Sequence, residues 1–525
     1  MTKSNNKKAN LTYLSLLIFV GLVVAPLVLC GCGRKRVNRE HSNKVSDEFE
    51  YLTRRIKVHC PGNRNLSRKE TEQDLDELEW LLENRYSYLK LKGIGYKAAL
   101  DSIRCSLGDG ISRGTLALQL MKFIALFGDG HSRVGDPSLK WMCSGYLPFI
   151  IEQSKGKLVS FKEDRSDFVD PNFPFLRALD GLPVNTWLEA AGQFVARGSP
   201  QFLRYQSIRH LRFIEVLRKE LGLKDKGSIQ IELESIDGSR TRTIELPLAQ
   251  TRPLYGFWPR PQKEIKSVED IQVETGILPH NIGYLRIITC LDEPKFLGSL
   301  IEAMKQLKNT DGLIVDVRSN GGGSRAPLRV LLPFFISEEE PAQVLNIAAY
   351  RLGHRKDILD ARWLYPENWQ GWSKAEKEAI SKVAENFKPQ WTLPQNEFSQ
   401  WHYLVLTHLK QSDYFYYDRP VIILMNTTNY SATDIFLGAF ITRPNVTLMG
   451  TPSGGGSGRY QSYRLRHSLI KIHLSSMASF QPNGKLYDGN GIQPDVFIEP
   501  IPTDFIGKTD SILQTAIQRL QKKDG

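Results

Sequence analysis

The sequence predicts a multi-domain α/β protein, and three observations lead to that fold class. Two segments, 307–335 and 420–440, each run from an apolar strand through a tight turn to an apolar helix, which predicts strands of one parallel sheet. A region of helical periodicity and then a region of short alternating strands precede them. At 525 residues and 41% hydrophobic content, the chain is long enough for about two to four domains.

The first 70 residues differ in charge from the rest of the chain. They contain 14 Lys and Arg against 5 Asp and Glu, so most of the formal net charge of +12 lies there. The remaining residues are nearly balanced and indicate no nucleic-acid surface. We therefore expect no nucleic-acid partner and relate the basic excess to export and tethering beside anionic lipid.

Residues 1–32 predict an export signal or an anchor. Lys3, Lys7 and Lys8 precede an apolar run at 11–29 that ends in Leu-Cys-Gly-Cys, and this resembles a bacterial lipoprotein signal with Cys32 as the lipidated residue. The run is also long enough for an uncleaved transmembrane helix, because basic residues follow it directly. Either anchor predicts a membrane-tethered protein of the cell envelope that faces the periplasm or the exterior.

Residues 33–67 are polar and basic and predict a flexible tether, and residues 68–140 predict a helical region. Leucines at helical spacing indicate one helix there (Leu75, Leu78, Leu81 and Leu82), and residues 116–127 indicate a second. Gly110 to Gly114 match the nucleophile-elbow pattern of esterases. Since that elbow needs a preceding strand, we expect Ser112 to start the following helix instead, which makes a serine esterase the weaker hypothesis.

Ser431 is the candidate nucleophile. It follows the apolar strand 421–425 and the turn 426–430, and it precedes a helix marked by Ile435, Phe436, Ala439 and Phe440. The N–H of Ala432 and the helix dipole would favour negative charge beside the hydroxyl. The alternative is that Ser431 only caps the helix.

A glycine turn follows the other strand of the pair. Gly321, Gly322 and Gly323 would let successive N–H groups face an anion, as in an oxyanion hole or a phosphate nest. The Gly-Lys-Ser/Thr ending of a nucleotide loop is missing, so a phosphate loop is disfavoured, and a structural turn remains the alternative.

Serine chemistry also needs a base and an orienting group. Of the ten histidines, His131 lies in a shaped loop of glycines and aspartates, Phe-Gly-Asp-Gly-His-Ser, whereas the other nine have ordinary surroundings. Asp488 is the best candidate carboxylate, and Asp495 in the same turn-rich segment competes with it.

Together these segments resemble the C-terminal processing (tail-specific) serine protease family, particularly its tricorn-core-like branch. The resemblance covers most of the chain after about residue 70 and implies a crotonase-like β/α core at 251–525, including a Trp-rich insertion at 354–401. It also implies a PDZ-like domain at 141–250, with a hairpin at Asp237-Gly238. A PDZ fold binds peptide ends by strand addition, and a structural spacer is the alternative.

The resemblance implies Ser431 as nucleophile, His131 as base, Asp488 as the residue that holds the imidazole, and the N–H groups of Ala432 and of Gly321 or Gly322 as oxyanion donors. Three positions depart from the family pattern. Gly456 stands where the other branch has a lysine base, Gly130 stands where the tricorn protease has a serine, and Asp488 replaces a glutamate. The implied function is an exported serine peptidase that cleaves peptides or unfolded proteins without cofactor or metal. The alternative is a catalytically inactive, membrane-tethered ligand-binding lipoprotein of the same fold.

The cysteines and the tryptophans each allow more than one structural interpretation. Cys60, Cys105, Cys143 and Cys290 show no metal-site spacing and allow three disulfide pairings or free thiols. Five of the nine tryptophans lie in 363–401, where we expect them to pack a helical subdomain, with a lid over the cleft as a second hypothesis.

Overall fold

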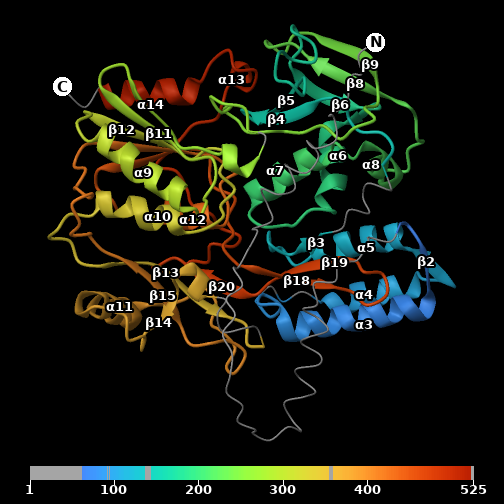
Figure 1. Ribbon diagram of the computed structural model, residues 1–525. Helices are drawn as coiled ribbons and strands as arrows, with labels where there is room; N and C mark the ends of the chain where they lie inside the picture. Colours follow the sequence, from blue (N-terminus) through green and yellow to red (C-terminus); the bar gives the residue numbers. More distant parts are fainter. Residues whose placement is uncertain are drawn as a thin grey trace, which may run out of the picture.

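The computed structural model describes residues 62–91, 93, 95–135, 143–265, 267–353 and 359–521 (Figure 1). The predicted signal at 1–32, with Cys32, and most of the predicted tether lie outside this range. Within it, no helix combines the length and the apolar composition that a membrane crossing requires.

A six-stranded sheet positions the candidate site. Its order is β10-β11-β12-β16-β17-β21, and every pair is parallel except β10 with β11. The two predicted strand–turn–helix units supply the adjacent strands β12 and β16, as expected. The strands are β10 (Glu274–Leu278), β11 (Ile282–Arg286), β12 (Gly312–Asp316), β16 (Val421–Met425), β17 (Val446–Gly450) and β21 (Val496–Phe497).

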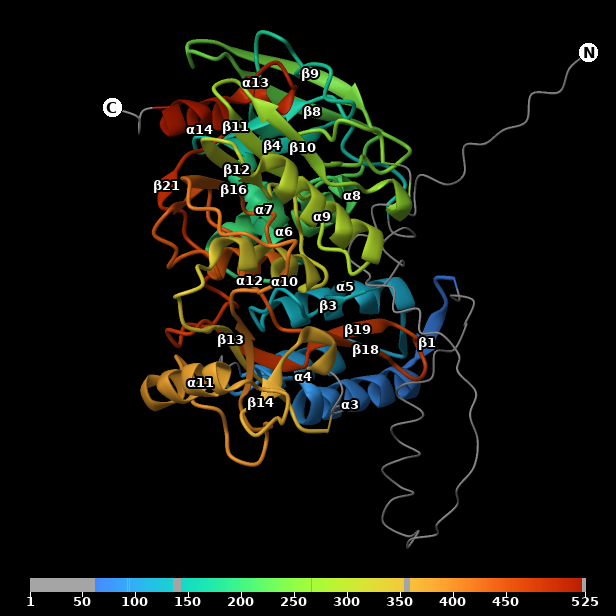
Figure 2. The same cartoon turned by 60° about the vertical axis from the view of Figure 1, so that its left-hand side comes forward.

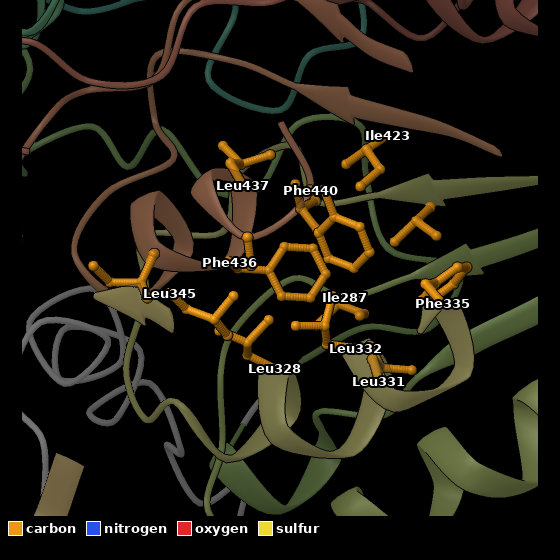
Figure 3. Packing of buried hydrophobic residues seen from close by; sticks show 14 of the residues in the cluster. Ile287, Leu328, Leu331, Leu332, Phe335, Leu345, Ile423, Phe436, Leu437 and Phe440 are labelled. Atoms are coloured by element: carbon orange, nitrogen blue, oxygen red, sulfur yellow. The ribbon is translucent and has the colours of Figure 1, made fainter. Parts of the chain in front are cut away.

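Helices cover both faces of this sheet, which explains why its central strands are apolar throughout. Leu313 and Val315 pack on one side with α9 (Pro294–Leu307), α10 (Ala326–Leu331) and α12 (Ala432–Gly438). Ile314 faces the other side, toward α13 (Pro502–Phe505) and α14 (Ser511–Gln521). Figure 3 shows Phe436 and Phe440, from α12 and the residues after it, packed against Ile287 and the α10 leucines.

The N-terminal helices pack against strands from the C-terminal part of the chain (Figure 2). The helices are α3 (Arg68–Arg85), α4 (Tyr96–Cys105) and α5 (Arg113–Ala125), preceded by the paired strands β1 (Asn65–Ser67) and β2 (Gly110–Ser112). β3 (Arg133–Val134) pairs with β19 (Lys471–Ser475), which pairs with β18 (Tyr460–Arg464). The predicted start of α5 is confirmed, because the Ser112 hydroxyl accepts a hydrogen bond from the N–H of Thr115.

Residues 143–249 form an antiparallel sheet in the order β4-β5-β6-β8-β9, with β7 paired to β6. Three helices pack against it, and the predicted hairpin between β8 and β9 is confirmed. The strands are β4 (Ile150–Ser154), β5 (Lys157–Phe161), β6 (Phe175–Leu179), β7 (Leu182–Pro183), β8 (Ser228–Glu234) and β9 (Thr241–Pro247), and the helices are α6 (Val184–Gly192), α7 (Pro200–His210) and α8 (Ile214–Glu220). A PDZ-like peptide-binding role for this domain stays a prediction.

The Trp-rich insertion packs around one helix and a sheet edge rather than forming a helical subdomain. Trp372 is buried beside α11 (Lys374–Asn386), and Trp401 contacts Phe480. The sheet has the order β14-β15-β13-β20. Its strands are β13 (Gln343–Tyr350), β14 (Tyr365–Pro366), β15 (His402–Leu406) and β20 (Met477–Phe480), and short 3-10 turns lie at Val268–Asp270, Leu332–Phe335 and Asp360–Arg362.

Three of the four scattered cysteines lie in the described part of the chain. Cys105, Cys143 and Cys290 are free thiols there, and Cys60 lies outside it. Cys290 is buried beside the glycine turn, where its backbone N–H donates to the carbonyl of Gly322 at 3.1 Å.

Candidate active site

Ser431 occupies a strained turn between β16 and α12. Its φ of 61° and ψ of −116° lie outside the regions that residues with a side chain prefer, so the surrounding packing must hold it there. The side chain caps no N–H of α12, contrary to the N-cap alternative. The hydroxyl is therefore available for another contact.

Gly322 lies directly against the Ser431 turn. Its φ is 100°, and an added Cβ would stand 2.4 Å from the carbonyl oxygen of Tyr430 and 2.9 Å from the Ser431 Cβ. No side chain fits at this position. The glycine turn after β12 and the serine turn after β16 are therefore in contact because the strands are adjacent and parallel.

A buried asparagine joins the two turns. The Oδ1 atom of Asn320 accepts hydrogen bonds from the Gly322 N–H at 2.9 Å and from the Thr433 hydroxyl at 2.8 Å. Its amide nitrogen donates to the carbonyl of Ile287 at 2.9 Å. These bonds fix the glycine turn relative to the start of α12.

The same network changes the predicted set of oxyanion donors. The N–H of Gly322 is engaged by Asn320, so Gly322 is not a free donor in this conformation. The N–H groups of Gly321 and Ala432 donate no hydrogen bond to any other described residue. Of the three predicted donors, Gly321 and Ala432 are thus the ones available to a ligand.

His131 faces Ser431 from the loop between α5 and β3. Its Nε2 atom lies 3.4 Å from the Ser431 Oγ, at the long end of the hydrogen-bond range. The loop is held by Asp129, which accepts from the His131 backbone N–H at 2.9 Å and from the Ser132 hydroxyl. The Ser132 hydroxyl in turn accepts from the Ser475 N–H of β19 at 3.1 Å. The His131 side chain is 7% exposed, so little bulk water reaches it.

Asp488 lies behind the imidazole, but not in direct hydrogen-bond contact with it. Its Oδ1 atom is 3.9 Å from the His131 Nδ1 and has no hydrogen-bond partner among the described residues. The other oxygen accepts from the Tyr88 hydroxyl at 2.5 Å and from the Ser457 N–H at 3.4 Å. The carboxylate is therefore oriented by Tyr88 and can act on the imidazole through space.

Tyr430 makes the direct contact that Asp488 does not make. Its hydroxyl lies 3.1 Å from the His131 Nδ1, and the two rings lie 4.7 Å apart. Phe202 of α7 stacks on the opposite side of the phenol at 4.6 Å. Burial and the nearby carboxylates of Asp488 and Asp129 raise the pKa of Tyr430 well above its usual value, so the hydroxyl stays protonated.

Two glycines that depart from the family pattern make room for this phenol. An added Cβ would lie 2.1 Å from the Tyr430 hydroxyl oxygen at Gly130 and 2.0 Å from it at Gly456. Larger residues at either position would displace Tyr430. The phenol therefore occupies the space next to both glycines, the positions where the resemblance in the sequence would place a serine and a lysine.

Asp434 fixes the loop that carries Gly456. This fully buried carboxylate accepts from the Ser453 hydroxyl, from the Gly456 N–H at 2.9 Å and from the Gly455 N–H at 3.3 Å. Burial raises the pKa of Asp434 to about 7, and the negative charge of Asp488 adds to this effect, while the three hydrogen bonds oppose it.

The structure separates the two candidate carboxylates. Asp495 accepts a hydrogen bond from the backbone N–H of Leu448 on β17 at 2.8 Å, which is a structural role. Asp129, His131 and Asp488 each offer one ligand atom within 4.8 Å of the others, a spacing that a metal ion requires. Both oxygens of Asp129 already accept hydrogen bonds within its own loop, so the group fits an orienting network better than a metal site.

Sequence reasoning brought together Ser431, His131 and Asp488, but it gave Tyr430, Asn320 and Asp434 no role. Tyr430 and Asp434 flank the nucleophile in the sequence, and this proximity is the one signal that could have drawn attention to them. Their partners, His131 and the loop at 453–456, are distant in the chain, so the contacts follow only from the fold.

The fold and the site together define an α/β protein with a Ser–His–Asp constellation of the kind that serine hydrolases use. Residues 281–498 match the model of peptidase family S41, a stretch that includes Ser431 and Asp488. A carboxy-terminal-processing protease of Bartonella bacilliformis is 31% identical over 91 residues, which cover 17% of this chain and 21% of that protein. The match thus spans about one fifth of the relative's length.

Two solved structures resemble the fold over most of the chain. The crystal structure of mature CPAF superposes with a TM-score of 0.61 at 17% identity, covering 87% of this chain and 98% of that chain. Mature CPAF complexed with lactacystin gives a TM-score of 0.60 at the same identity and coverage. At this level of identity the likeness concerns the fold, which is mixed α/β and multi-domain.

Proposed function

We propose that this protein is an exported serine peptidase that hydrolyses peptide bonds through an acyl-enzyme on Ser431. The observation that carries the proposal is the approach of the His131 Nε2 to the Ser431 Oγ at 3.4 Å, next to the unoccupied N–H groups of Gly321 and Ala432. In active sites without substrate, catalytic hydrogen bonds are often long, and they shorten when substrate binds. The match of residues 281–498 to peptidase family S41 supports a peptidase over other acyl-transfer chemistry.

The first step is attack of the Ser431 oxygen on the peptide carbonyl carbon. The Nε2 atom of His131 accepts the hydroxyl proton and then delivers it to the leaving amine. Water next attacks the ester, with His131 again as base. General-base help of this kind contributes about 10²–10⁴-fold, and each oxyanion donor contributes about 10²–10³-fold.

For Nε2 to accept a proton, the neutral imidazole must carry its hydrogen on Nδ1. In our proposal the Nδ1–H donates to the Tyr430 hydroxyl oxygen, and the unpaired Oδ1 of Asp488 favours positive charge on that side of the ring. At 3.9 Å and an effective dielectric constant near 20, a carboxylate and an imidazolium attract each other by about 4 kcal/mol. Tyr430 thus orients the ring, and Asp488 stabilises its charged form.

Peptides or unfolded proteins are the proposed substrates, without a cofactor or metal in the reaction. The proposed location is the cell envelope, with Cys32 as lipid anchor or the segment 11–29 as a transmembrane anchor. The test is hydrolysis of an unfolded protein by the purified chain. Wild type should cleave it and Ser431→Ala should not, whereas activity in Ser431→Ala would refute the assignment.

A second candidate is a ligand-binding protein of the same fold that does not turn over. The engaged N–H of Gly322 and the 3.9 Å gap between Asp488 and His131 favour it, because both weaken the catalytic arrangement. Such a protein would bind unfolded peptide and release it intact. Cleaved fragments that disappear with Ser431→Ala would exclude this alternative.

A further inference from the structure

α7 packs against β4, outside the candidate active site (Figure 1). A cluster of arginines lies there, around Tyr255 of the loop after β9. The guanidinium of Arg209 is positioned over the ring of Tyr255 at 4.1 Å and over that of Tyr205 at 4.4 Å. Arg212 approaches the same Tyr255 ring at 5.9 Å. Arg165 donates to the Tyr255 carbonyl at 2.9 Å. Several cations therefore share one aromatic residue.

One carboxylate forms ion pairs with the arginines of this cluster. Glu152 of β4 pairs with Arg209 at 3.1 Å and lies 3.7 Å from Arg165. Arg212 and Arg252 form no ion pair within the described residues. The carboxylate of Glu215 accepts hydrogen bonds from the N–H and the hydroxyl of Ser144 instead.

The arginines are partly buried. The Nε atoms of Arg209 and Arg212 are buried without a hydrogen-bond partner, although the Arg209 side chain as a whole is 18% exposed. Burial lowers the pKa of Arg212 to about 10, and repulsion by Arg252 and Arg209 adds to this effect. Partly desolvated charges are stabilised by pairing, and the one carboxylate, Glu152, does not balance the positive charge of these partly buried arginines.

We propose that Arg209, Arg212 and Arg252 form a binding site for an oxyanion, either a phosphate or a carboxylate group. Guanidinium groups bind planar and tetrahedral oxyanions through paired, charge-assisted hydrogen bonds. Tyr255 and Tyr205 provide the walls, and the partly exposed face of Arg209 provides access. The free phosphate ion and the carboxylate of a peptide are the two sources with this chemistry.

The position of the site links it to the catalytic centre. The first turn of α7 contacts that centre: Phe202 stacks on Tyr430, and the Ser199 hydroxyl donates to the carbonyl of Gly454 at 2.6 Å. Arg209 lies at the other end of the same helix. An oxyanion bound there would hold α7 against β4. It would thereby restrict the motion of Phe202 and Tyr430, which lie beside His131.

Titration calorimetry of the full chain carrying Ser431→Ala tests the proposal independently of peptidase activity. The probes are inorganic phosphate and a short peptide with a free C-terminal carboxylate, each at constant ionic strength, with the C-terminal amide of the peptide as reference. We expect saturable binding of at least one probe that Arg212→Gln weakens at least tenfold. Arg177→Gln, which removes an exposed arginine of β6, should leave it unchanged.

The pattern of binding identifies the source of the oxyanion. Binding of phosphate alone indicates a free anion, and binding of the peptide but not of its amide indicates a peptide terminus. Arg212→Gln should melt no lower than its parent without ligand, because it removes a repulsive charge, and should lack the rise in Tm that the bound probe gives the parent. Absence of saturable binding, or equal binding by Arg212→Gln, would overturn the proposal. Arg252→Gln repeats the test if Arg212→Gln fails to fold.

Discussion

Removal of the Tyr430 hydroxyl tests whether this group orients the His131 imidazole. In Tyr430→Phe the ring, its stacking on Phe202 and its packing against the glycines are kept, and only the contact at the His131 Nδ1 is lost. The nearest remaining acceptor is the Asp488 Oδ1 at 3.9 Å, which is beyond hydrogen-bond distance. A buried nitrogen left in this state costs about 1–3 kcal/mol, which corresponds to about 5- to 150-fold in kcat.

The assay is steady-state hydrolysis of an unfolded protein or a fluorogenic peptide from about pH 6 to 9. Because Tyr430 stays protonated throughout this range, kcat should fall by a similar factor at each pH, with KM little changed. Tyr463→Phe is the matched control. It removes a buried phenolic hydroxyl that has no hydrogen-bond partner in the described structure and should leave kcat and Tm nearly unchanged.

Two results would exclude this role of Tyr430. If Tyr430→Phe keeps the wild-type kcat, the phenol does not orient the base. If Tyr463→Phe lowers kcat equally, the loss reflects general destabilisation of the fold rather than the contact with His131.

Four substitutions and the analysis of the N-terminus have expected outcomes. Gly322→Ala should abolish activity and lower Tm, since its Cβ would meet the Tyr430 carbonyl. Gly298→Ala within α9, where nothing lies within 4 Å of an added Cβ, should raise stability by about 0.4–1 kcal/mol, and thermal melts compare the two variants. In the folded protein the pKa of Asp434 is raised to about 7, so the fold favours the protonated side chain. This contribution to the free energy of unfolding is complete below about pH 4, and about 4 kcal/mol of it is lost as the pH rises through about 7. Urea unfolding should therefore show wild type losing stability relative to Asp434→Asn over that interval, and parallel curves would contradict the shift. Asp488→Asn should lower kcat by at least tenfold without destabilising the fold, because Tyr88 can still donate to the side-chain oxygen; unchanged kcat would remove Asp488 from the mechanism. Mass spectrometry of the mature N-terminus should find a lipidated Cys32, and an intact Met1 would favour the transmembrane anchor.

Apolar periodicity and turn residues predicted the parts of the fold that depend on local sequence. The strands at 312–316 and 421–425, the leucine-marked helix α3 and the hairpin between β8 and β9 all follow from spacing within one segment. Packing of the tryptophans depends on partners outside the segment, such as Phe480, and the predicted helical subdomain was therefore wrong.

The candidate site divides in the same way. Ser431, His131 and Asp488 each had a local signal, a turn between a strand and a helix or a glycine-rich loop, and the fold brings them together. The contact between Tyr430 and Nδ1 joins residues 299 positions apart, and the bond from the Gly322 N–H depends on the rotamer of Asn320. These two contacts do not follow from any repeating pattern in the sequence, so they could not be predicted from it.

Covalent labelling with a fluorophosphonate probe, followed by peptide mass mapping, tests the central claim most directly. We expect one adduct on Ser431, lost in Ser431→Ala and formed far more slowly in His131→Ala. An unlabelled wild-type chain that is folded by circular dichroism, or labelling that persists at the same rate without His131, would contradict it.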